Sequence, residues 1–139
     1  MGSLPSEIGR WSNIQFAAIL EASLTGTIPS ELGRWTSCHT FFLKGCLDVS
    51  GTLPTELGLM EGLQLFHVFG TPVSGTIPSE IGLLTNALDF FFHTTELSGT
   101  MPEEVCALPF KDLSANCLPI SPELPPQVEC DCCTDCFAV

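Results

Sequence analysis

The chain has 139 residues, of which 45% are hydrophobic and only 14% are charged, with four Lys or Arg against sixteen Asp or Glu. This length and composition predict one compact domain. The formal charge of −12 excludes nucleic acid and anionic membranes as partners, because none of the four basic residues belongs to a basic patch. No run approaches the roughly 18 apolar residues of a membrane-spanning helix, so we expect no membrane insertion by this segment.

A phrase rich in glycine and proline returns five times along the chain. It reads Gly-Ser/Thr-Leu/Ile-Pro-Ser/Thr-Glu-Ile/Leu-Gly at residues 2–9, 26–33, 51–58 and 75–82, and a blurred copy occupies residues 99–105. The first glycines, at positions 2, 26, 51, 75 and 99, are separated by 24, 25, 24 and 24 residues. A fixed period within the roughly 20–50 residues of stacked repeats predicts a solenoid.

Between the phrases, apolar residues recur at a fixed offset, and two of them in each repeat are two positions apart. Such an alternation predicts a short strand with one buried face. Because a single turn cannot bury that face alone, neighbouring turns should stack and pair their strands about 4.8 Å apart in a parallel sheet. The inward pairs are Ala17 and Ile19, Phe41 and Leu43, Phe66 and Val68, and Phe90 and Phe92.

The phrase itself predicts the return path of each turn. Proline fixes its own φ and has no N–H, Ser or Thr can cap a short helix, and Glu suits the first turn of a helix dipole. We therefore expect short, mostly 3₁₀, helical turns on the outer edge, each closed by a glycine. The closing glycines are Gly9, Gly33, Gly58 and Gly82.

The repeat resembles a known family. The pattern Leu-Ser/Thr-Gly-x-Ile/Leu-Pro-x-x-Ile/Leu-Gly occurs at residues 24–33, begins with Val at Val49 and Val73, and is blurred at residues 97–105. It is similar to the plant-type leucine-rich repeats of receptor-kinase ectodomains, polygalacturonase inhibitors and secreted or cell-surface algal proteins. The resemblance implies an α/β leucine-rich-repeat solenoid that is right-handed, with a parallel β-sheet on the concave face and short 3₁₀ turns on the convex side.

The resemblance also divides the chain. Residues 1–105 hold about four clear repeats of 24–25 residues plus the start of a degenerate fifth, and residues 106–139 hold the degenerate last turn and a Cys-rich C-terminal cap. The family's inward Asn, which bonds backbone groups of successive turns, should fall at Ala22, Cys46, Thr71 and Thr95, and none of these is Asn. Thr can replace some of those bonds and Ala cannot, so we expect a looser or irregular turn around the first repeat.

The eight cysteines form two groups. Cys38 and Cys46 occupy inward positions of one repeat, where a bridge and two buried thiols both fit the sequence. The other six follow the last repeat. They favour a disulfide-stapled cap, similar to those that end extracellular repeat proteins, over a zinc site, because their spacing lacks paired Cys-x-x-Cys knuckles. These disulfide candidates are Cys106, Cys117, Cys130, Cys132, Cys133 and Cys136, and the sequence does not choose their connectivity.

The strand residues that alternate with the inward pairs should form the concave surface. In register, they make an aromatic and histidine strip with a polar margin, and aromatic anchors with a polar rim are typical of recognition surfaces. The alternative is a register slip of one residue, which would send the same side chains into the core. The expected ligand-binding residues are Phe42, Lys44, His67, Phe69, Asp89, Phe91 and His93.

These observations favour a non-enzymatic recognition module. The histidines at positions 39, 67 and 93 accompany no nucleophile in a strained turn and no paired carboxylates, so we expect no catalytic residue, metal or cofactor. The resemblance implies an extracellular or cell-surface protein that binds a protein or peptide, or a wall polysaccharide, on its concave strip. No signal peptide is recognised, which suggests a fragment of a longer protein. The alternative is a structural or adhesive module that self-associates through an uncapped N-terminal turn.

Overall fold

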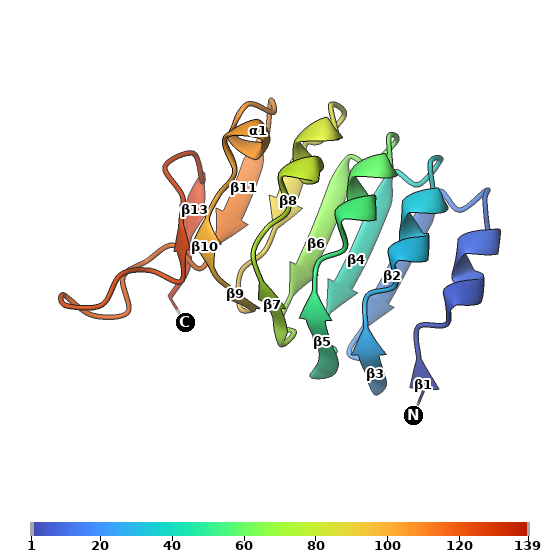
Figure 1. Cartoon of the computed structure of the whole chain (residues 1–139), viewed down its shortest axis with the longest axis horizontal. Helices are drawn as coiled ribbons and strands as arrows, with labels where there is room; N and C mark the ends of the chain where they lie inside the picture. The colour runs from blue at the N-terminus through green and yellow to red at the C-terminus, as the bar shows by residue number, and fades with distance from the viewer. Residues whose placement is uncertain (1, 139) are drawn as a thin grey trace.

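The computed structural model describes residues 2–138 and is a solenoid whose turns lie side by side from the N-terminal to the C-terminal end (Figure 1). Each of the first four turns contributes a short strand to one parallel sheet, then a helical turn, then a strand to a second, longer parallel sheet. The solenoid predicted from the period of 24–25 residues is confirmed.

The longer sheet has six parallel strands in the order β13-β11-β8-β6-β4-β2. Phe41 pairs with Ala17 on one side and with Phe66 on the other, so equivalent residues of successive repeats are aligned. The strand register therefore follows the predicted alternation, and the one-residue slip does not occur. The strands are β2 (Phe16–Leu20), β4 (Thr40–Lys44), β6 (Leu65–Phe69), β8 (Asp89–Phe91), β11 (Asp112–Ala115) and β13 (Asp135–Cys136).

A second parallel sheet, which the sequence analysis did not predict, runs along the solenoid with the strand order β1-β3-β5-β7-β9. Its short strands arise from the Ser/Thr-Gly-Thr part of the phrase and the residues before it, where the chain stays extended before the proline. Stacking at a constant period brings these segments into register without any hydrophobic alternation. The strands are β1 (Gly2–Ser3), β3 (Leu24–Thr27), β5 (Asp48–Thr52), β7 (Val73–Gly75) and β9 (Glu96–Leu97).

The predicted 3₁₀ turns are confirmed, but their capping differs from the prediction. A proline occupies each N-cap position, and no side chain caps the helix; Ser30, for example, donates instead to the carboxylate of Glu31 at 3.4 Å. Proline suits this position because its missing N–H would have no helical partner there. The helical turns are η1 (Ser6–Arg10), η2 (Ser30–Arg34), η3 (Thr55–Leu59), η4 (Ser79–Leu83) and the α-helical α1 (Glu103–Cys106).

The glycines of these turns act through their size rather than as helix terminators. Gly33 and Gly58 lie inside η2 and η3, one residue before the last, and neither has a positive φ. A Cβ on Gly33 would collide with the backbone carbonyl of Glu56, and one on Gly58 with that of Glu80. Glycine is therefore required because adjacent helical turns pack backbone against backbone.

One continuous core runs between the two sheets and the helical turns. Phe66 is fully buried, and its ring lies 5.7 Å from Phe41, 5.5 Å from Phe90 and 5.8 Å from Phe92, centroid to centroid. These contacts join the second, third and fourth turns. The inward strand residues of the first turn, Ala17 and Ile19, are only half-buried.

The chain leaves the long sheet through one repeated conformation. The corresponding residues Glu21, Gly45, Gly70 and Thr94 all have a positive φ, of 49°, 65°, 64° and 54°. Two of them are glycines, for which this region is free of strain. Since Glu21 follows the same backbone course as the others, the irregularity expected in the first repeat is not seen at this position.

Asn116 provides the inward asparagine that the sequence analysis assigned to no repeat. Its buried side chain accepts the N–H of Thr94 at 2.7 Å and donates to the carbonyl of Thr95 and to Gln127 Oε1, both at 2.9 Å. It was missed because it follows Thr95 by 21 residues, short of the regular period. Asn116 thus ties the fourth turn to the cap.

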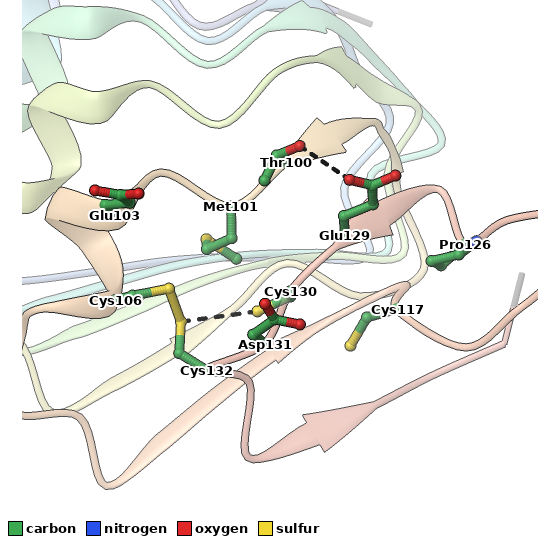
Figure 2. Close-up of a pocket in the computed structure, with 10 residues that line it drawn as sticks. All are labelled: Thr100, Met101, Glu103, Cys106, Cys117, Pro126, Glu129, Cys130, Asp131 and Cys132. Carbon is green, nitrogen blue, oxygen red and sulfur yellow. Dashed lines mark hydrogen bonds between the residues drawn. A yellow bond between two sulfur atoms is a disulfide. The ribbon is translucent and has the colours of Figure 1, made fainter.

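The cap continues the long sheet and adds a separate two-stranded sheet. β13 pairs with β11, and β12 (Val128–Glu129) pairs with β10 (Gly99–Thr100), so Leu113 and Val128 are buried at the end of the core. The expected disulfide-stapled cap is confirmed, and the zinc alternative is wrong. The bridges are Cys106–Cys132, which Figure 2 shows, Cys117–Cys136 and Cys130–Cys133.

Cys38 and Cys46 are free, fully buried thiols, so the alternative of a bridge within one repeat is wrong. Burial raises the pKa of the Cys38 thiol, which keeps it protonated and unreactive. The Cys46 thiol lies 3.6 Å from the carbonyl of Lys44 at the end of its strand. Both cysteines therefore act as small core residues.

Candidate functional site

The long sheet has a solvent face, on which every second residue points away from the core. Phe42 pairs with Ala18 of β2 and His67 of β6, and His67 pairs in turn with Phe91 of β8. These side chains are half-buried, whereas the residues on either side of Phe42, Phe41 and Leu43, are fully buried. Strand alternation therefore places Phe42, His67 and Phe91 in one row on the solvent face.

The rings of this row stack on one another. The centroids of Phe42 and His67 lie 4.4 Å apart, and those of His67 and Phe91 lie 4.1 Å apart, with an interplanar angle of 15° in both pairs. Phe16, which is exposed, adds an edge contact to Phe42 at 6.0 Å. The stack crosses four neighbouring strands without interruption.

A second row of rings lies beside the first. His93 lies 4.8 Å from Phe69 and 4.1 Å from Phe137, and Lys44 Nζ lies 5.5 Å from the centre of the Phe69 ring. We call Phe42, His67, Phe69, Phe91 and His93 together the aromatic strip. Phe137 was not among the expected residues, because its place beside His93 depends on the fold of the disulfide cap.

Burial governs the charge of the two histidines in the strip. Burial lowers the pKa of His67, the carboxylate of Asp89 partly opposes this, and His93 lowers the pKa further by repulsion between the two rings in their protonated forms. Burial also lowers the pKa of His93. Both rings are therefore neutral at pH 7.

Three polar atoms on this side of the sheet are buried without a hydrogen-bond partner. They are Nε2 of His67, Oδ1 of Asp89 and Oγ of Ser114, from three consecutive strands. All seven expected ligand-binding residues thus lie on the solvent face or at its edge. Lys44 is exposed at the margin and Asp89 is half-buried beside Asp112.

The cap has a hollow of its own, of about 620 Å³, between α1 and the proline-rich segment (Figure 2). Met101 and the Cys106–Cys132 bridge form its apolar part, and the Glu129 carboxylate accepts a hydrogen bond from Thr100 at 3.2 Å. Among residues 2–138, no three His, Cys, Asp or Glu side chains gather as a metal site requires. Within the same range, no helix is both long and apolar enough to cross a bilayer.

Comparison with known proteins identifies the repeat. No protein-family model and no curated protein matches the chain, but solved structures do. A plant peptide hormone receptor, RGFR1 in complex with RGF2, shares 30% identity over 81% of this chain and 18% of its own, with a TM-score of 0.73. The PEPR1–AtPEP1 structure shares 26% identity over 86% of this chain and 18% of its own, with a TM-score of 0.74.

A third match is the leucine-rich-repeat ectodomain of the membrane receptor kinase GASSHO1/SCHENGEN3 from Arabidopsis thaliana, in complex with CASPARIAN STRIP INTEGRITY FACTOR 2. It shares 25% identity over 93% of this chain and 17% of its own, with a TM-score of 0.74. The chain is a leucine-rich-repeat protein of the plant type. This leucine-rich-repeat chain spans about a fifth of the length of the three structures.

The matched structures include a plant peptide hormone receptor and the leucine-rich-repeat ectodomain of a membrane receptor kinase. Three disulfides within a chain of this size are typical of proteins from oxidising compartments. Both findings point to an extracellular location and a non-enzymatic role for the repeat module.

Proposed function

We propose that this chain is a non-enzymatic recognition module of an extracellular or cell-surface protein, and that it binds an extended peptide or protein segment along the aromatic strip. The observation that carries the proposal is the stack of Phe42, His67 and Phe91 on the solvent face of the sheet, with Phe69 and His93 beside it. The core is already filled by other rings, so packing does not require these.

An exposed aromatic row of this kind is suited to binding. Phenylalanine rings contribute a large apolar area with few rotatable bonds, and they dominate the energy of interfaces when a partner covers them. Stacking on both sides fixes the ring of His67 before any ligand arrives, so little side-chain entropy is lost on binding. A plant peptide hormone receptor among the matched structures supports a peptide as the ligand class.

The proposal is tested with a displayed library of random linear peptides. We expect selection on the wild-type chain to yield binders, and Phe42→Ala with Phe91→Ala to weaken them at least about tenfold, as loss of a central aromatic anchor does. Leu83→Ala is the matched control, because Leu83 is an exposed apolar residue on η4, away from the strip. Unchanged binding by the double variant would refute the site.

Two further outcomes of this test discriminate between explanations. If the double variant loses thermal stability as a core variant does, the rings serve packing and not recognition. If no peptide binds but wall oligosaccharides do, and the double variant loses them, the strip is a carbohydrate surface and the peptide assignment is wrong.

A second candidate function is structural self-association, and the apolar end of the first turn favours it. Trp11, Phe16 and Leu20 are 55%, 62% and 56% exposed there. Trp11 and Phe16 line a hollow of about 400 Å³ that reaches Trp35. Sedimentation over a wide range of protein concentrations tests this candidate. A mass that rises with concentration supports it, and a monomer at every concentration excludes it.

A further inference from the structure

The aromatic strip ends in an acidic region on the last three strands of the long sheet. Asp89 of β8 pairs in register with Asp112 of β11, and Ser114 of β11 pairs with Phe91 on one side and Asp135 of β13 on the other. Because Leu113 and Ala115 point into the core, Asp112 and Ser114 point to the solvent face. Three carboxylates therefore lie on the last three strands of the sheet, at Phe91 and beyond it.

Two polar atoms of this region lack a partner. Ser114 is 2% exposed and its hydroxyl makes no hydrogen bond, and Oδ1 of the half-buried Asp89 is equally unpaired. A buried polar atom without a partner destabilises the folded chain, because it has lost its hydrogen bonds to water. A ligand that brings hydrogen-bond donors to this place would remove that cost, so the unpaired atoms indicate a complementary group rather than a surface left to solvent.

The polar groups of this region favour a positively charged ligand with several hydrogen-bond donors. Carboxylates only accept hydrogen bonds at neutral pH, and Lys111, next to Asp112, is the only Lys or Arg in β8, β11, β13 or the residues flanking them. A metal ion does not fit, since no three acidic, His or Cys side chains within residues 2–138 gather closely enough to hold one. The partner must therefore reach across strands.

We propose that Asp89, Asp112 and Asp135, with Ser114, form a subsite for the guanidinium group of an arginine in the bound peptide. This inference rests on the proposed function and names the chemistry of one ligand residue. A guanidinium has five donors in a planar fork, pairs with carboxylates through two bonds, and packs on aromatic rings such as Phe91. The net charge of −12 favours approach of a basic peptide.

The subsite is tested with a single-residue probe, independently of any selected peptide. Amide chemical shifts of the chain are followed by NMR during titration with N-acetyl-arginine methylamide, for which a dissociation constant of about 1 mM is expected. Shifts should be confined to β8, β11 and β13. The citrulline analogue, which keeps the shape and loses the charge, should produce no shifts there.

Variants separate the subsite from the overall negative charge. Asp89→Asn and Asp112→Asn should each weaken the probe about tenfold, and Ser114→Ala about threefold. Asp48→Asn is the matched control, because this exposed carboxylate lies on β5 of the other sheet and its loss should change nothing. Equal shifts with citrulline, or shifts that spread over the glutamates of η1–η4 and survive Asp89→Asn, would overturn the subsite.

A second measurement keeps the result decisive if the probe binds too weakly. Peptides selected on the wild-type chain should contain arginine, and replacing it by citrulline should weaken them about tenfold. Selected peptides that lose nothing on this replacement, yet still depend on Phe42 and Phe91, would refute the arginine subsite and leave the proposed function intact. If the selected peptides depend neither on their arginine nor on Phe42 and Phe91, both the arginine subsite and the proposed function are refuted.

Discussion

Replacing Phe66 by Ala and, separately, Phe42 by Ala compares a core ring with a strip ring on adjacent strands. Phe66 is fully buried and contacts Phe41, Phe90 and Phe92 at centroid distances of 5.5–5.8 Å. A buried Phe→Ala change costs about 3–5 kcal/mol, through lost transfer energy and the cavity left behind. Since the whole chain is expected to be stable by only about 5–15 kcal/mol, this is a large fraction.

Phe42→Ala should lower the free energy of unfolding much less than Phe66→Ala does. Its ring is half-buried, and its stacking partner His67, at 4.4 Å, lies on the solvent face as well. Losing one stacked pair and part of one ring's burial amounts to about 1 kcal/mol. Phe66→Ala should in addition uncouple the second, third and fourth turns, because a solenoid is held together through contacts between neighbouring repeats.

Urea unfolding followed by far-UV circular dichroism measures both variants, in non-reducing buffer so that the cap disulfides stay intact. We expect the free energy of unfolding to fall about three times as much or more for Phe66→Ala as for Phe42→Ala. Equal losses would refute the reasoning, because they would mean that both faces of the sheet are packed.

Three other changes test separate parts of the fold. Gly58→Ala should destabilise the chain by about 2 kcal/mol or more, because its Cβ meets the backbone of the next turn, whereas Gly2→Ala, with no atom within 4 Å, should be nearly neutral in the same urea titration. Asn116→Ala should cost about 2–3 kcal/mol and speed hydrogen exchange in the cap, since it removes three hydrogen bonds and leaves backbone groups unpaired. Acidification should lower the urea midpoint below about pH 6.5. The pKa values of His67 and His93 are lowered in the folded chain, so the unfolded chain takes up protons first, and the stability present above that pH is lost as the pH falls. The urea midpoint of the wild-type chain should therefore fall on acidification, and His67→Gln should reduce this fall. A wild-type midpoint that rises instead, with a rise that His67→Gln abolishes, would contradict the predicted direction.

The sequence predicted the phase of the repeat because Gly and Pro mark the same point of every turn. Once that phase is known, a period of two separates Phe41 from Phe42 and assigns one to the core and the other to the solvent face. The face of the strip was therefore predictable, whereas its role in binding stays a proposal.

Other features were not readable from the sequence for physical reasons. The second sheet consists of Ser-Gly-Thr segments without alternation, and it forms only because stacking aligns them. The glycines of the helical turns were interpreted as terminators, while their function depends on the distance to the next turn. The positions of Phe137 and Asn116 depend on the fold of the cap. That fold depends in turn on three disulfides, whose pairing the spacing of the cysteines does not reveal.

The most direct test of recognition by the aromatic strip is to map where a selected peptide binds, by amide chemical-shift perturbation on the wild-type chain. We expect the largest shifts on β4, β6 and β8, with weaker ones on β11 and β13. The largest shifts on the second sheet, on η1–η4, or around Trp11 at the apolar end would contradict it, because binding would then take place away from the strip.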